Sequence, residues 1–190
     1  RLIGAMADAR RNDTPRQIAG KPTAKTAEPR KSITLRDVSP HRPSVLAVGS
    51  STGGPEALNV MIDDLPDDFP LPILITQHMP KLFTALLADT ISKRTGKIAV
   101  EAAEGMTVEP GKIYIAPGDH HMTITGTPTR SVIRLNQEPP VNYCRPSVEP
   151  MLQSIVRIYK EKTLVVILTG MGADGQKGAE LAVESGGSVI

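Results

Sequence analysis

The sequence predicts an α/β fold: a doubly wound, mostly parallel sheet with helices on both faces, plus an antiparallel hairpin region. Short runs of consecutive apolar residues alternate with segments whose apolar residues recur at helical spacing. The runs lack polar alternation, which is typical of parallel strands buried on both faces. Between residues 97 and 135, Pro-Gly turns separate shorter runs that are typical of hairpin or edge strands.

Each element follows from its own residues. Pro55 is tolerated in the first turn of a helix, Ser147 suits an N-cap, and Gly186-Gly187 suits a helix end. The sequence therefore predicts strands at Val45–Val48, Leu71–Thr76 and Leu164–Thr169, hairpin or edge strands at Lys112–Ile115 and Met122–Thr125, helices at Pro55–Leu65, Lys81–Lys93, from Ser147 to about Glu161 and at Gln176–Glu184, and the start of a strand at Ser188–Ile190.

Charge divides the chain near Ser44. The 190 residues carry a net charge of +2, but Arg1–Ser44 holds 10 basic and 4 acidic residues, and the rest holds 12 basic and 16 acidic. Asn12–Pro43 is rich in Pro, Thr, Ala, Lys and Arg without a sustained period, which predicts an extended connector before a folded part that begins near Ser44. This connector contains no Phe, Tyr or Trp, so its composition does not favour nucleic-acid binding.

Several function classes are disfavoured by composition. The single Cys144 excludes an internal disulfide framework, and the longest apolar runs, such as Leu164–Leu168, are too short to cross a membrane. The first residues are arginine-rich and lack the apolar block and cleavage site of a signal peptide. We therefore expect a cytoplasmic protein without membrane insertion.

A nucleophile motif follows the first predicted strand. Gly49–Gly54 matches G-x-S-x-G with Ser51 in the nucleophile position, and a strand precedes it and a helix follows it, as this motif requires. Glycines permit a sharp turn, and the helix N-terminus offers free N–H groups. A Gly-Ser turn that only caps the helix remains the alternative.

A serine hydroxyl needs a base. His78 directly follows the second predicted strand, at the sheet edge expected for Ser51, whereas His41 lies in the connector and His120 and His121 lie in the hairpin region. Asp174 lies in the loop after the strand Leu164–Thr169.

A carboxylate in that loop can orient the histidine, although an Asp that caps the following helix is the alternative. The chain order Ser51, His78, Asp174 differs from that of α/β-hydrolases, so an ordinary α/β-hydrolase is disfavoured.

Five segments, taken in order, carry a resemblance to a known family. They are Val45–Leu58, Ile75–Pro80, Ile113–Met122, Pro139–Glu149 and Val166–Gly175. Together they resemble the catalytic domain of the chemotaxis protein-glutamate methylesterases, the CheB family. The resemblance covers nearly everything from Ser44 to Ile190.

The resemblance implies hydrolysis of glutamate γ-methyl esters on the cytoplasmic helices of chemoreceptors, with release of methanol, and deamidation of receptor glutamines, as part of chemotaxis adaptation. It implies that Ser51 is the nucleophile, His78 the general base and Asp174 the orienting carboxylate. It also implies that Thr52 is an active-site neighbour and that the backbone N–H of Met171 contributes to an oxyanion hole. No metal or organic cofactor is expected.

The resemblance further implies a longer, regulated protein. In the family, an N-terminal receiver domain covers the active site until the chemotaxis histidine kinase phosphorylates this domain. On this basis, residues 1–43 are interpreted as the tail of the receiver domain plus the interdomain linker. Residues 44–190 are interpreted as the methylesterase catalytic domain, without its C-terminal end. Ser50 stands where family members commonly have a small, alanine-like residue, but the register of the motif selects Ser51.

Two other functions remain open: a non-catalytic receptor-binding fragment and a general serine esterase. Arg145 is a candidate contact for an acidic receptor surface, although an arginine that braces its own loop is equally consistent with the sequence. His120, His121 and Cys144 are not expected to form a metal site, because adjacent histidines on a strand point in different directions.

Overall fold

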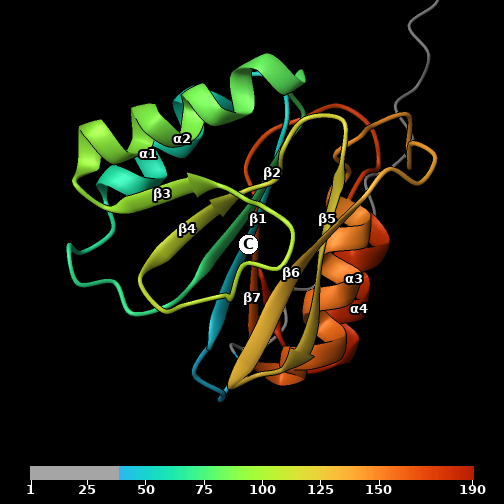
Figure 1. Ribbon diagram of the computed structural model, residues 1–190. Coiled ribbons are helices and arrows are strands. Elements are labelled where there is room, and N and C mark those ends of the chain that lie inside the picture. The colour runs from blue at the N-terminus through green and yellow to red at the C-terminus, as the bar shows by residue number, and fades with distance from the viewer. Residues whose placement is uncertain (1–38) are drawn as a thin grey trace, which may run out of the picture. The chain divides into compact units, whose positions relative to one another are not determined.

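A computed structural model describes residues 39–190 of the chain (Figure 1). The connector predicted for residues 1–43 therefore lies almost entirely outside the described residues. The described elements are, in chain order, β1 Val45–Ser50, α1 Gly54–Asp63, β2 Ile73–Gln77, α2 Lys81–Thr95, β3 Ile98–Glu101, β4 Lys112–Ile115, β5 His121–Thr127, β6 Arg130–Asn136, α3 Val148–Tyr159, the 3-10 turn η1 Lys160–Lys162, β7 Thr163–Ile167, α4 Gln176–Glu184 and β8 Ser188–Val189.

Six strands form one parallel sheet in the order β3-β4-β2-β1-β7-β8 (Figure 1). Every neighbouring pair in this sheet is parallel. The prediction of a doubly wound, mostly parallel sheet is confirmed.

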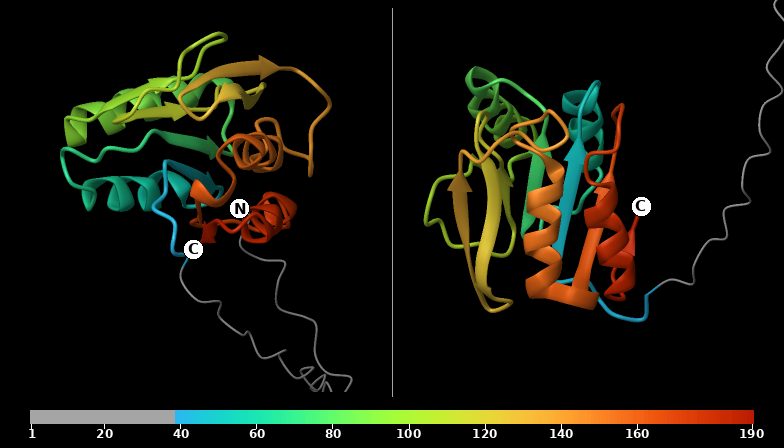
Figure 2. Two further views of the ribbon diagram at one scale, coloured as in Figure 1. Left: turned by 90° about the horizontal axis from the view of Figure 1, so that it is seen from below. Right: turned by 90° about the vertical axis from the view of Figure 1, so that its right-hand side faces the viewer.

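Both faces of the sheet are covered, α1 and α2 packing on one and α3 and α4 on the other (Figure 2). Along β1, Val45 and Ala47 belong to the core under α3 and α4, whereas Leu46 and Val48 belong to the core under α1 and α2. All six residues of β1 are buried. Burial on both faces is the reason why this strand has a continuous apolar sequence.

The antiparallel hairpin of β5 and β6 forms a second, separate sheet that contributes Met122, Ile124 and Ile133 to the α3 side of the core. The hydroxyl of Ser154 on α3 accepts a hydrogen bond from the Ile124 amide at 3.0 Å. The predicted hairpin region is confirmed for Met122–Thr125.

The prediction of a hairpin or edge strand at Lys112–Ile115 is wrong. This segment is β4, an inner strand that pairs in parallel with both β2 and β3. A helix is the usual connection between parallel neighbours, but residues 102–111 connect β3 to β4 without one. That connection runs beside β6, where Thr107 bridges to Val132 and the amide of Val108 donates to the Ser131 carbonyl at 2.9 Å. The Pro and Gly residues of this connection therefore resemble those of a hairpin turn, although the strand that follows them is internal.

The order of the strands places the carboxyl ends of β1 and β7 side by side. From β1 the chain proceeds to β2 on one side of it, and β7 is added later on the other side. Ligand sites of open α/β sheets lie in the crevice at such a reversal of strand order. The amide of Ser51 donates to the Thr169 carbonyl at 2.9 Å, which joins the two loops that follow these strands.

Within residues 39–190, no helix combines the length and the apolar character that crossing a bilayer requires.

Candidate active site

Ser51 is the first residue after β1 and begins the turn that leads into α1. The sharp change of direction occurs at Gly53, the N-cap of α1, whose φ is 75°, a value that favours glycine. Ser51 is not among the described non-glycine residues with positive φ. The strand, turn and helix predicted around the motif are therefore present, and the left-handed backbone is carried by Gly53 and not by the serine.

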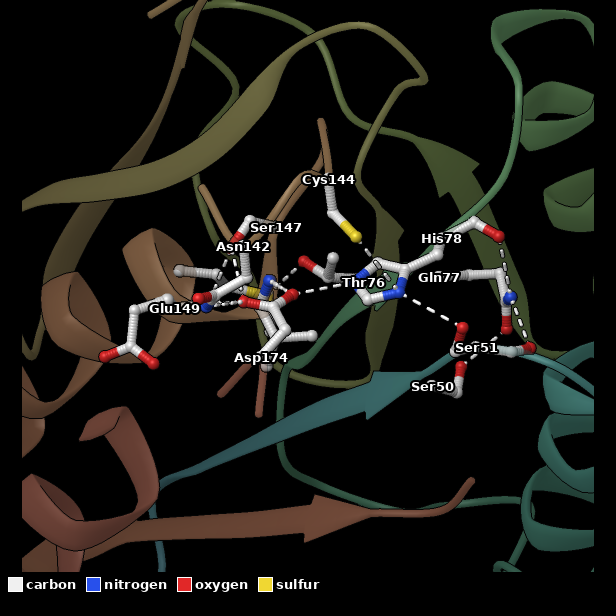
Figure 3. A network of polar contacts seen from close by, with 12 residues as sticks. Ser50, Ser51, Thr76, Gln77, His78, Asn142, Cys144, Ser147, Glu149 and Asp174 are labelled. Carbon is white, nitrogen blue, oxygen red and sulfur yellow. Dashed lines mark hydrogen bonds and ion pairs between the residues drawn. The ribbon is translucent and has the colours of Figure 1, made fainter. Parts of the chain in front are cut away.

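His78 connects the other two predicted triad residues (Figure 3). Its Nδ1 lies 3.2 Å from Oγ of Ser51, and its Nε2 lies 2.7 Å from Oδ2 of Asp174. A carboxylate only accepts, so Nε2 carries the proton and the lone pair of Nδ1 faces the serine. In the chymotrypsin arrangement the two ring nitrogens have the opposite partners. Ser51, His78 and Asp174 thus come together from the ends of three different strands.

Asp174 accepts hydrogen bonds from several donors besides His78. Its Oδ1 accepts from the Ser147 hydroxyl at 2.5 Å and from Nδ2 of Asn142 at 3.0 Å, and its Oδ2 accepts from the Val148 amide at 2.8 Å. Burial acts to raise the pKa of Asp174, but the hydrogen bonds from His78, Ser147, Asn142 and Val148 outweigh it and hold this pKa well below its usual range. The carboxylate therefore stays ionised beside the imidazole.

The alternative that Asp174 caps the following helix is wrong. The N-cap of α4 is Gly175, which makes no side-chain cap. Asp174 instead accepts from the first amides of α3, together with Ser147, the N-cap of that helix. Negative charge is favourable at a helix N-terminus, so α3 stabilises the ionised carboxylate. Sequence reasoning identified Ser147 as a cap but did not place it in the site, because the partner of the cap comes from a distant loop.

Gln77 links the loop that carries Ser51 to the loop that carries His78, a contact that the sequence did not reveal. Its Nε2 donates to the Ser51 carbonyl at 2.8 Å and to the His78 carbonyl at 3.1 Å, and its Oε1 accepts from the Ser50 hydroxyl at 2.6 Å. Gln77 and Ser50 are each 2% exposed. A Cβ at Gly54 would lie 1.8 Å from Oε1 of Gln77, so any other residue at this position would displace the Gln77 side chain. A polar residue at the end of an apolar strand was the available signal.

Thr52 lies on the loop after β1 and Met171 on the loop after β7, and these two loops meet where the strand order reverses. Met171 lines the same pocket as Ser51, His78 and Asp174, whereas Thr52 is outside its lining. The Thr52 carbonyl accepts from the Thr169 hydroxyl. Neither backbone amide donates a hydrogen bond to another residue of the described segment 39–190. Both amides are therefore free to donate to a bound oxygen.

Arg145 braces the loop in which it lies. Its Nε and Nη2 donate to Oδ1 of Asp119 at 3.0 and 2.6 Å. Its Nη1 donates to the carbonyls of Gln137 and Glu138, both at 3.1 Å. This geometry supports the loop-bracing alternative, and contact of Arg145 with a receptor stays a prediction.

The rings of His120 and His121 have partners other than Ser51, His78 and Asp174. His121 is 1% exposed, and both its nitrogens are engaged: Nδ1 accepts from the Ser147 amide and Nε2 donates to the Pro139 carbonyl, each at 3.2 Å. His120 contacts its own turn through the Gly118 carbonyl.

Cys144 does reach the site, with Sγ 3.6 Å from Nδ1 of His78. Among residues 39–190, His78, Cys144 and Asp174 are a group of metal-ligating side chains whose donor atoms lie within 4.8 Å of one another. Burial, aided by the charge of Asp174, raises the pKa of the Cys144 thiol, so the thiol is protonated at neutral pH.

Comparison with known proteins identifies the family. The model of the CheB methylesterase family matches residues 46–190. The chain belongs to the CheB methylesterase family. The match begins within β1 and includes Ser51, His78 and Asp174.

Relatives and a solved structure agree with CheB membership. A Rhodospirillum rubrum protein named protein-glutamate methylesterase/protein-glutamine glutaminase 1 is 44% identical over 177 residues, covering 92% of this chain and 46% of that protein. An Azospirillum brasilense protein-glutamate methylesterase/protein-glutamine glutaminase is 50% identical over 150 residues, covering 78% of this chain and 38% of that protein. The crystal structure of the Thermotoga maritima CheB methylesterase catalytic domain is 42% identical, with a TM-score of 0.75 and 79% of each chain covered. The chain thus spans less than half the length of these two curated relatives.

Proposed function

We propose that this chain is the catalytic part of a protein-glutamate methylesterase and protein-glutamine glutaminase that acts on the cytoplasmic helices of chemoreceptors. The observation that carries the proposal is the hydrogen-bonded series Ser51, His78, Asp174 at the switch point of the sheet. The names of the relatives and the match of the CheB family over the same residues support the substrate class.

In the proposed reaction, Oγ of Ser51 attacks the ester carbonyl carbon while its proton passes to Nδ1 of His78. The free amides of Thr52 and Met171 donate to the resulting oxyanion. When the tetrahedral intermediate collapses, the carbon–oxygen bond to the methoxy group breaks, and His78 returns the proton so that methanol leaves. Asp174 keeps the ring in the required tautomer and stabilises the imidazolium.

The second half of the reaction regenerates the serine. Water attacks the acyl-serine carbonyl and gives a proton to His78, and the bond to Oγ breaks as His78 returns that proton to Ser51. The product is glutamate. With a glutamine substrate the same steps release ammonia in place of methanol. Every proton transfer uses the Nδ1 lone pair, and no step uses a metal or organic cofactor.

The regulatory setting is part of the proposal. Residues 1–43 are proposed to be a receiver-domain tail and linker, and residues 44–190 the catalytic domain. We propose that an N-terminal receiver domain, phosphorylated by the chemotaxis histidine kinase, controls access to this site in the cytoplasm. The family match and the partial coverage of the relatives support this setting.

Release of methanol from a methylated receptor fragment tests the proposal. Ser51→Ala should remove turnover, while Ser185→Ala, which alters a half-buried serine at the C-cap of α4, should turn over like the unaltered chain. Stoichiometric acylation of Ser51 by an active-site serine reagent is expected. Methanol release by Ser51→Ala at the rate of the unaltered chain would refute the nucleophile assignment.

Acylation of Ser51 and a comparison of two ester substrates separate the proposed function from the two other functions. A receptor-binding fragment without activity would bind the receptor and show no selective acylation of Ser51. A general serine esterase would hydrolyse a simple acetyl ester faster than the methylated receptor helix. Either result would overturn the proposed function.

A further inference from the structure

We propose that this site also binds Zn²⁺ as an inhibitor, through Nδ1 of His78 and Sγ of Cys144, with Oγ of Ser51 as a third ligand. Inhibition of turnover rests on the proposed hydrolase function, but the binding of the metal does not. Cys144 takes no part in the proposed reaction.

The two donor separations measured from Nδ1 of His78 match those expected around one tetrahedral ion. Zinc binds sulfur at about 2.3 Å and histidine nitrogen at about 2.0–2.1 Å, so a tetrahedral angle separates the two donors by about 3.6 Å. Sγ of Cys144 lies 3.6 Å from Nδ1 of His78. Zinc–oxygen bonds of about 2.0–2.2 Å correspond to a nitrogen–oxygen separation of about 3.4 Å at the same angle. Oγ of Ser51 lies 3.2 Å from the same Nδ1. Water would complete the shell.

Asp174 orients the proposed ligand and does not bind the metal itself. Histidines that bind metals generally donate their other ring N–H to a carboxylate or carbonyl, which fixes the tautomer. Nε2 of His78 lies 2.7 Å from Oδ2 of Asp174, and this contact leaves the lone pair of Nδ1, which contacts Ser51 and Cys144, as the ring's metal ligand (Figure 3). The Asp174 oxygens already accept from Ser147, Asn142 and two amides of α3. A metal would have to displace these donors to reach the carboxylate.

The chemistry of the donors favours zinc over magnesium or calcium. A thiolate and an imidazole suit Zn²⁺, whereas Mg²⁺ and Ca²⁺ take oxygen ligands. On binding, the Cys144 thiol loses its proton to solvent and the sulfur–metal bond forms. The ion then occupies the Nδ1 lone pair that the proposed reaction needs for the Ser51 proton. Inhibition follows directly from the shared nitrogen.

Direct binding can be measured without any activity. Co²⁺ replaces Zn²⁺ in tetrahedral sites, and a cobalt–thiolate bond gives a charge-transfer absorption. Titration of the chain with CoCl₂ should produce this band, and ZnCl₂ should remove it by displacement. Cys144→Ala should not produce the band, while His120→Asn, which alters a histidine outside the group, should produce it fully. Absence of the band from the unaltered chain, or its presence in Cys144→Ala, would overturn the proposal.

Turnover gives the second readout. Measured against its own zinc-free rate of methanol release, Cys144→Ala should need at least about tenfold more ZnCl₂ for half-inhibition, since loss of a metal partner weakens affinity by at least this factor. A chelator should restore activity to the inhibited chain. Equal zinc sensitivity of the two chains would contradict the proposal. A cobalt–thiolate band in a chain that releases no methanol would instead refute the proposed function and leave the metal site standing.

Discussion

The hydroxyl of Ser147 donates to Oδ1 of Asp174 at 2.5 Å, although 27 residues separate them in the chain. Ser147 is also the N-cap of α3, and its Oγ accepts from the Glu149 amide. Ser147 therefore caps the start of α3 and also holds the carboxylate that contacts His78. The start of α3 and the loop after β7 form a single polar structure.

Ser147→Ala should lower both stability and turnover. Loss of an N-cap hydroxyl costs about 1 kcal/mol, and Asp174 loses one of its donors. We expect a lower midpoint of urea unfolding and a fall of about tenfold in kcat, with a smaller change in KM. Ser147→Thr keeps the hydroxyl and should recover most of the activity. If Ser147→Ala and Ser147→Thr had the same kcat, the hydroxyl would have no positioning role.

Gln77→Met should loosen the link between the loops that carry Ser51 and His78 while keeping the volume of the side chain. The Ser51 and His78 carbonyls and the buried Ser50 hydroxyl would lose their Gln77 partner. A buried polar group left without a partner costs about 1–3 kcal/mol, so the free energy of unfolding should fall together with kcat.

The double variant with Ser50→Ala tests the coupling between these side chains. Ser50→Ala removes the hydroxyl that Gln77→Met would leave without a partner. The loss of stability in the double variant should therefore be smaller than the sum of the two single losses. Strictly additive losses would show that the two side chains act independently.

Acid should weaken the protein partly through Asp174. Its native pKa lies well below its usual range because its hydrogen bonds outweigh burial, whereas an unfolded Asp titrates near about 3.9. A lowered native pKa contributes stability that is fully present above the unfolded pKa and is lost as the pH falls toward the native value. The free energy of unfolding should therefore decline below about pH 4.

Asp174→Asn isolates this contribution, because other carboxylates with lowered pKa, such as Glu104 and Asp119, remain in the variant. We expect the variant to be less stable at pH 7 and to have a shallower decline between about pH 4 and pH 2. Urea unfolding across this range measures both quantities. Parallel pH profiles for the two chains would contradict the lowered pKa.

Arg145→Lys should distinguish loop bracing from contact with a receptor. Lysine keeps the charge but cannot reproduce the fork that holds Asp119 and two carbonyls. If Arg145 braces the loop, the midpoint of thermal unfolding should be lower in Arg145→Lys than in the unaltered chain. The KM of the variant for the receptor fragment should then change little. An unchanged midpoint with a raised KM would favour the receptor contact.

Local sequence determined the fold class and three side chains of the site. Runs of consecutive apolar residues are typical of parallel strands covered by helices on both faces. Every residue of β1 and β2 is buried, whereas β7 alternates buried with partly exposed residues and ends at the exposed Ile167. The carboxyl ends of parallel strands share one edge, which brings together the residues that follow them. Ser51, His78 and Asp174 were therefore predictable from their positions after these strands.

Tertiary structure decided what local sequence could not, because its contacts join segments far apart in the chain. The internal place of β4 depends on a connection that lies beside β6. The capping of α3 by Asp174 depends on the loop after β7, and the approach of Cys144 to Nδ1 of His78 spans 66 residues. Side chains of this kind have no local pattern, since only packing of the whole sheet and its loops determines their partners.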